Sequence, residues 1–106
     1  MVENTPEFPG GELALHKYIN TAIEYPGLAQ ENGIQGKVFV NFVVDKDGIV
    51  SDAKIFRGVD PSLDKEALRV IMSLPKWNPG MQRGKAVRVS FTVRVSFTVP
   101  ISFQLQ

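Results

Sequence analysis

Several residues of the chain have the chemical types used in catalysis or metal binding, but their spacing indicates other roles. His16 is the only histidine and there is no cysteine, so neither a nucleophile–base pair nor a thiolate metal site has its members. Asp45, Asp47 and Gly48 resemble the start of a calcium loop, yet the twelfth position from Asp45 is Phe56 instead of glutamate. We therefore predict a tight turn at this acidic segment, with positive φ at Gly48, and a surface position for His16.

A second group of carboxylates has the composition of an acid–base site. Asp60, Asp64 and Glu66 follow one another closely, but Pro61 suits the first position of a helix and Asp60 suits the N-cap before it. The other two carboxylates then lie near the positive end of the helix, where negative charge is favourable. We predict no catalytic residue, no metal site and no cofactor, and hence no enzyme.

The element that must organise the domain is the stretch from Lys85 to Leu105, in which apolar and polar residues alternate. The apolar residues at odd positions are Val87, Val89, Phe91, Val93, Val95, Phe97, Val99, Ile101, Phe103 and Leu105. Alternation of this kind predicts a strand with one face on the core and one face in water.

Within this strand the sequence Val-Arg-Val-Ser-Phe-Thr occurs twice, at 87–92 and at 93–98. Six is an even number, so a slip by one unit keeps every apolar side chain on the same face, and the pattern allows two registers. A compact chain of this length has a radius of gyration of about 13 Å, whereas a strand over the whole stretch would extend roughly 60 Å. We expect one copy to lie in the sheet and the other to form a loop or to project from the domain.

Length and composition indicate one small domain whose net charge favours no strongly charged partner. The 106 residues carry a formal net charge of +1, which argues against a nucleic-acid partner and against membrane contact by this fragment itself. No apolar run is long enough for a membrane span, and no signal peptide is visible. The missing cysteines give no information on redox compartment.

Periodicity and turn residues predict an α+β domain in which an antiparallel sheet of about three strands is covered on one face by helices. Residues 1–11 form an extended lead-in, and Trp77 is a core residue, with a ligand-facing aromatic as the alternative. The predicted order is a helix at 12–23, a short helix at 26–30, strands at 37–44 and 49–56, a helix at 61–74, a loop at 81–84 and the long strand.

Residues in this order and spacing resemble the C-terminal domain of the TonB energy-transducer family, over nearly the whole chain. The stretches that carry the resemblance are Tyr25-Pro26 with Ala29, Gly33-Ile34-Gln35-Gly36-Lys37-Val38, Phe42-Val43-Val44 with Asp47-Gly48, Leu63-Asp64 with Ala67, Pro75-Lys76-Trp77 with Pro79-Gly80, Gly84-Lys85 with Val87, and Pro100 with Phe103. The Pro9-Gly10-Gly11 lead-in is similar to a common variant of that family.

The resemblance implies a peptide-binding module of the Gram-negative periplasm. Such a domain binds the TonB box, a short peptide of outer-membrane transporters, as a strand added beside the last strand. It transmits force from a proton-driven motor of the inner membrane, in which the parent protein is anchored. The positions that match the peptide site are Tyr25, Pro26, Val87, Val89, Phe91, Val93, Val95, Phe97 and Val99.

The chain departs from the family pattern in two respects. It lacks the membrane anchor and the proline-rich linker, and it has two copies of the six-residue unit where the pattern has room for one. The extra copy gives an alternative function, that of a natural or engineered scaffold whose long last strand drives self-association. We expect a homodimer through that strand, with the copy nearer Pro100 in the family's register.

Overall fold

The computed structural model describes residues 4–98 of the chain. The predicted order of elements is confirmed, with one β-hairpin added before the last strand. The elements are α1 (Glu12–Ala22), α2 (Gly27–Glu31), β1 (Gly36–Val44), β2 (Val50–Arg57), α3 (Pro61–Met72), β3 (Gly80–Gln82), β4 (Lys85–Val87) and β5 (Val89–Phe97).

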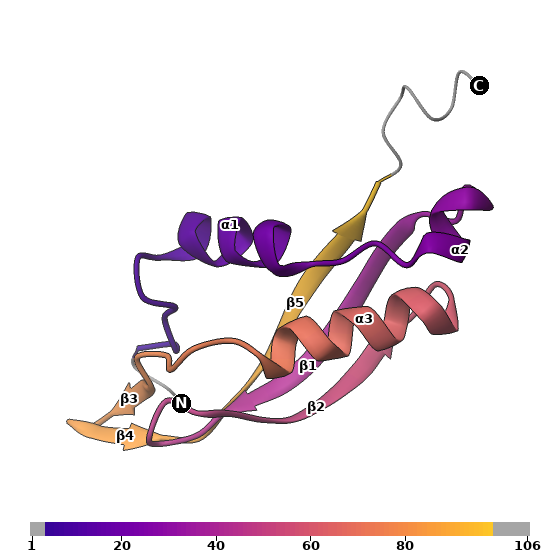
Figure 1. The fold of residues 1–106 in the computed structure, drawn as a ribbon. Coiled ribbons are helices and arrows are strands. Elements are labelled where there is room, and N and C mark those ends of the chain that lie inside the picture. The colour runs from indigo at the N-terminus through magenta and orange to yellow at the C-terminus, as the bar shows by residue number, and fades with distance from the viewer. Residues whose placement is uncertain (1–3, 99–106) are drawn as a thin grey trace.

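The main sheet is antiparallel, with three strands in the order β2-β1-β5. Figure 1 shows α1 and α3 on one face of this sheet and the β3–β4 hairpin at one end. Strand β1 is central and pairs with β5 along its whole length, from Gly36 opposite Phe97 to Val44 opposite Val89. The predicted fold class, an antiparallel sheet covered on one face by helices, is therefore confirmed.

Alternation along the strands decides which side chains form the core. Alternate residues of β1 are buried (Val38, Val40, Phe42 and Val44), and the residues between them are not. The odd residues of β5 turn toward the helices in the same way. Helix α3 closes the core with its apolar stripe, which comprises Leu63, Ala67, Val70 and Ile71. The alternate apolar side chains of the strands thus pack against the apolar stripe of α3 in one layer.

The turn between β1 and β2 has the predicted chemistry. The side chain of Asp45 accepts the backbone N–H of Asp47 at 2.8 Å and that of Ile49 at 3.0 Å. Gly48 has φ 82°, and its carbonyl accepts the backbone N–H of Trp77 at 2.8 Å. A Cβ at Gly48 would lie 2.0 Å from the carbonyl oxygen of Trp77, so only glycine fits.

The prediction that one repeat copy loops out or projects is wrong. Strand β5 contains Val89–Thr92 of the first copy and Val93–Phe97 of the second, and both pair with β1. The remaining apolar residue of the first copy, Val87, ends β4 and pairs with Gly80. The nine residues of β5 extend about 30 Å, so about half of the stretch lies in the sheet, as the size argument required. The strand begins inside the first copy, however, and not at the boundary between the two copies. Val99, Pro100 and the rest of the predicted strand lie outside the described residues.

The predicted loop at 81–84 is also wrong, because this segment belongs to a hairpin. Strands β3 and β4 pair antiparallel across a turn at Arg83 and Gly84, whose φ values are 52° and 74°. Two consecutive positive φ values are what a two-residue hairpin turn requires. The described part of the lead-in lies against this hairpin region through bridges from Asn4 to Met81 and from Glu7 to Asn78, and it turns at Phe8, whose carbonyl accepts the backbone N–H of Gly11.

Candidate functional site

The unoccupied edge of β5 is the most prominent binding feature of the fold. β5 pairs with β1 on one side, and no strand within residues 4–98 pairs with its other side. Nine residues of extended backbone therefore present N–H and C=O groups at a sheet edge. An extended peptide can pair with such an edge through its own backbone.

A groove of about 440 Å³ lies beside the middle of this edge. On the helix side its wall consists of the lead-in, α1 and Trp77 from the segment after α3, and on the other side it extends past the edge to the open face of the sheet. The residues of the helix-side wall include Thr5, Pro6, Glu7, Phe8, Glu12, Leu15, His16 and Trp77. The strand itself contributes Phe91, Thr92, Val93 and Arg94, and Phe39 of β1 lies beyond them.

Trp77 connects the core to this groove. Its side chain is 3% exposed, and its ring lies 5.5 to 5.6 Å from the rings of Phe8, Phe42 and Phe91 in edge-to-face geometry. The prediction of a core residue is confirmed, and the same ring lines the groove. Its indole N–H has no hydrogen-bond partner among the described residues, which leaves one buried donor at this wall.

The sequence did not indicate most of the groove wall. Phe8 is buried against Tyr18 and Trp77, although the lead-in has the composition of a loop. His16 is 40% exposed, as a surface residue, but it also lines the groove, with Nε2 3.6 Å from Oε1 of Glu12. These residues come together only through tertiary contacts. The sole sequence signal is that Phe8 is an aromatic residue within a Pro-rich and Gly-rich segment.

Five of the seven predicted strand residues lie on the edge strand β5, but their side chains belong mainly to the core. Val93, Val95 and Phe97 are buried beneath the helices, while Val89 and Phe91 are half-buried. Phe91 and Val93 line the groove. Val87 lies in β4, and Val99 lies outside the described residues. The edge therefore presents mainly the backbone of these residues.

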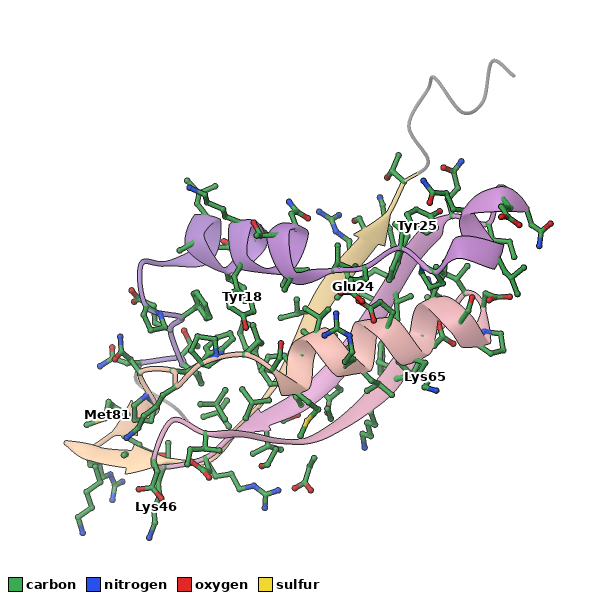
Figure 2. All side chains as sticks on the ribbon, viewed as in Figure 1. Tyr18, Glu24, Tyr25, Lys46, Lys65 and Met81 are labelled. Carbon is green, nitrogen blue, oxygen red and sulfur yellow. The ribbon has the colours of Figure 1, made fainter. Side chains whose placement is uncertain are left out.

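Tyr25 and Pro26 lie at a second hollow, of about 530 Å³, between the α1–α2 link and α3. Figure 2 shows Tyr25 near the end of β5, where its ring packs edge-to-face against Phe97 at 5.6 Å. Its hydroxyl donates to the carbonyl of Ile34, and burial raises the pKa of the phenol. Tyr25 thus fixes the end of the edge strand and does not line the groove along it.

Glu66 joins the helix layer to the α1–α2 link at this second hollow. The residue is 9% exposed. Its carboxylate accepts two hydrogen bonds from the Arg69 guanidinium, each at 2.7 Å, and a third from the backbone N–H of Glu24 at 2.6 Å. The Arg69 hydrogen bonds lower the pKa of Glu66, and the Glu24 N–H acts in the same direction, against the opposing effect of burial. Every oxygen has a donor, so the group is a structural ion pair.

Residues 4–98 contain no group of three or more His, Cys, Asp or Glu side chains that could hold a metal ion. None of the described helices is both long and apolar enough to cross a bilayer.

The fold defines a class: a small α+β domain with helices on one face of a three-stranded antiparallel sheet and an open edge at β5. Residues 21–99 match the family described as the Gram-negative bacterial TonB protein C-terminal, and the chain belongs to that family. The predicted resemblance is confirmed.

Similar proteins support the same family. Protein TonB of Haemophilus influenzae is 34% identical over 93 residues, which is 84% of this chain and 34% of that protein. Protein TonB of Pseudomonas aeruginosa is 32% identical over 63 residues, 59% of this chain and 18% of that protein. The chain thus spans about a third or less of these relatives.

Solved structures agree with the fold. An NMR solution structure of the Helicobacter pylori TonB C-terminal domain superposes with a TM-score of 0.62 at 26% identity, covering 81% of this chain and 90% of that one. A longer version of the same domain gives a TM-score of 0.52 at 28% identity, covering 87% and 89%.

Proposed function

We propose that this domain binds the TonB box of an outer-membrane transporter by strand addition at the free edge of β5. The observation that supports this most strongly is a nine-residue edge with no partner strand within residues 4–98, bordered by a groove at Phe91–Arg94. Backbone hydrogen bonds would supply affinity, and the side chains of the added strand would supply specificity.

The geometry of a strand predicts which residues of the site the side chains of such a peptide would contact. Its side chains would point alternately to the two faces of the sheet. Those on the helix face would meet Phe8, Phe91 and Trp77, and those on the open face would meet Thr92 and Arg94. Apolar residues fit the first set, and polar or acidic residues fit the second. In this proposal Tyr25 and Pro26 position the far end of the edge strand.

We propose the family's wider role for the parent protein. The domain would lie in the periplasm as the terminal part of an energy transducer anchored in the inner membrane, and its partners would be transporters of the outer membrane. The family to which the chain belongs, the Gram-negative bacterial TonB protein C-terminal, supports this role.

The test is a titration of the isotopically labelled protein with a TonB-box peptide, followed by amide NMR. We expect the largest shifts between Val89 and Phe97. Two N-methylated peptides sharpen the test. Methyl groups on the alternate amides that face β5 should abolish binding, whereas methyl groups on the other alternate amides should leave it intact. Equal loss with both peptides, or no response along β5, would rule out strand addition.

We propose self-association through the same edge as a second candidate, because β5 joins Val89–Thr92 of the first copy and Val93–Phe97 of the second in one uninterrupted strand. Two copies of β5 could pair antiparallel about a two-fold axis. This dimer would occupy the edge that the peptide needs. Added TonB-box peptide should therefore dissociate it, which light scattering can measure.

A further inference from the structure

The sheet face opposite the helices carries a concentration of basic side chains that the net charge conceals. Phe39 of β1 lies directly opposite Arg57 of β2 on one side and Arg94 of β5 on the other. The next residue on this face of β1, Asn41, lies opposite Lys54. The exposed basic residues of this open face are Lys37, Lys54, Arg57, Arg88 and Arg94.

Acidic residues are almost absent from the described part of this face. Asp52 pairs with Arg88 at 2.6 Å and is the acidic residue of β2. The helix layer has the opposite balance, since residues 12–31 and 60–72 together contain six acidic and three basic side chains. Folding thus separates the charges of a nearly neutral chain into a basic sheet face and an acidic helix face. Such a charge distribution orients a molecule toward an anionic surface even when its net charge is small.

The arrangement of the basic groups fits a planar partner. They come from all three strands: Lys37 from β1, Lys54 and Arg57 from β2, and Arg94 from β5, with Arg88 just before β5. Arginine binds phosphate in a bidentate manner, and lysine binds it as a point charge. Phe39 is half-buried at the centre of the face, so apolar surface accompanies the charge. Flat, basic and partly apolar surface is the chemistry of peripheral binding to anionic phospholipid.

We propose that the open face docks on an anionic phospholipid surface, with the acidic helix layer turned away from it. This replaces the expectation of no membrane contact, which rested on net charge alone. The contact is peripheral and electrostatic. It is separate from the peptide edge for most of its area, because Lys37 and Lys54 lie on β1 and β2, away from the groove that Arg94 lines.

The test uses flotation of the full chain with lipid vesicles at low salt. One set of vesicles is pure phosphatidylcholine, and the other contains about a third phosphatidylglycerol. The double variant K37Q/K54Q removes two lysines from the open face, and the control K17Q/K65Q removes two from the helix layer. Circular dichroism checks that both variants are folded.

We expect binding only to the anionic vesicles, weakening as salt is raised. Each basic residue near an anionic leaflet contributes roughly fivefold to the affinity, so K37Q/K54Q should bind about 25-fold more weakly, and the control should change by less than about twofold. Equal losses in the two variants would show that orientation plays no part and would overturn the proposal. So would failure of the unaltered chain to bind anionic vesicles, or binding to soluble polyglutamate in their place, which would indicate an acidic protein partner.

Discussion

The carboxylate of Glu66 accepts the backbone N–H of Glu24 at 2.6 Å, although the two residues are 42 positions apart in the sequence. This bond attaches the link between α1 and α2 to the middle of α3. The link leads directly to Tyr25, whose ring packs against the end of β5. One buried carboxylate thus connects the helix layer to the strand that carries the proposed peptide edge.

The variant Glu66→Ala should destabilise the domain by about 1.5–3 kcal/mol, because it removes charge-assisted hydrogen bonds and leaves the Glu24 N–H without its acceptor. Urea unfolding measures this change. The exposed neighbour Lys65 provides the control, and Lys65→Ala should change the free energy of unfolding by less than about 0.5 kcal/mol. Similar values for the two variants would contradict a structural role for the ion pair.

The same carboxylate predicts a pH dependence. The pKa of Glu66 is lowered in the folded state, so its contribution is complete above the ordinary carboxyl value of 4.5 and is lost as the pH falls through the lowered value. The stability difference between the unaltered chain and Glu66→Gln should therefore be constant near neutrality and should decrease in acid. Unfolding experiments from pH 7 to pH 3 test this. A difference that persists undiminished in acid would contradict it.

Gly48→Ala should be strongly destabilising, since φ is positive there and a Cβ would lie 2.0 Å from the carbonyl oxygen of Trp77. Gly33 is a matched control, because its φ is 67° but no atom lies within 4 Å of its ideal Cβ. Gly33→Ala should cost about 1–2 kcal/mol from the left-handed backbone alone. Gly48→Ala should cost clearly more in the same thermal melts, and equal losses would mean that the turn moves away from Trp77 freely.

Local chemistry explains which parts of the fold the sequence could predict. The strand periodicity, the Asp60 cap and the turn at Gly48 each depend on neighbouring residues, and each is confirmed. The hairpin of β3 and β4 was missed because its strands have three residues each and its turn uses Arg83, a residue type uncommon at positive φ. The start of β5 was misplaced because the two copies of the repeat are identical, so no residue marks that the strand begins at Val89, inside the first copy.

The site was less predictable than the fold. The edge strand itself could be identified from its alternation. The groove beside it could not, because its wall depends on Phe8 packing against Trp77, a contact across 69 positions of sequence. No pattern within the lead-in encodes that contact. The basic charge of the open face could not be predicted from the sequence for the same reason. Arg57 and Arg94 lie on either side of Phe39 only because β2 and β5 both pair with β1 in this register.

Trp77→Ala should cost about 3–5 kcal/mol, the usual loss for a buried large aromatic residue. Its fluorescence in the unaltered chain should be blue-shifted and weakly quenched by acrylamide, since the ring is 3% exposed. Bound peptide should change this emission, because the ring also lines the groove. Emission like that of free indole would contradict the packing, and emission unchanged by a bound peptide would place the peptide elsewhere.

The last prediction concerns the six-residue duplication. Deletion of Val87–Thr92 leaves one copy, and we expect the β3–β4 hairpin to hold the register, so that the segment Val99–Phe103 moves to the places of Val93–Phe97. The segments read Val-Pro-Ile-Ser-Phe and Val-Arg-Val-Ser-Phe, so the core positions change by one methylene group and the stability should change by less than about 1.5 kcal/mol. Proline would then replace Arg94 on the edge strand.

Proline has no N–H to donate and discourages strand pairing at an exposed edge. The duplicated chain lacks a proline anywhere in β5, so its edge is open to a second copy. We therefore expect the deletion variant to be a monomer, or a weaker dimer than the unaltered chain, in light scattering over a concentration series. Arg94→Pro in the full chain is the matched control and should weaken association in the same way. Equal mass for all three proteins at high concentration would exclude the edge of β5 as a dimer interface.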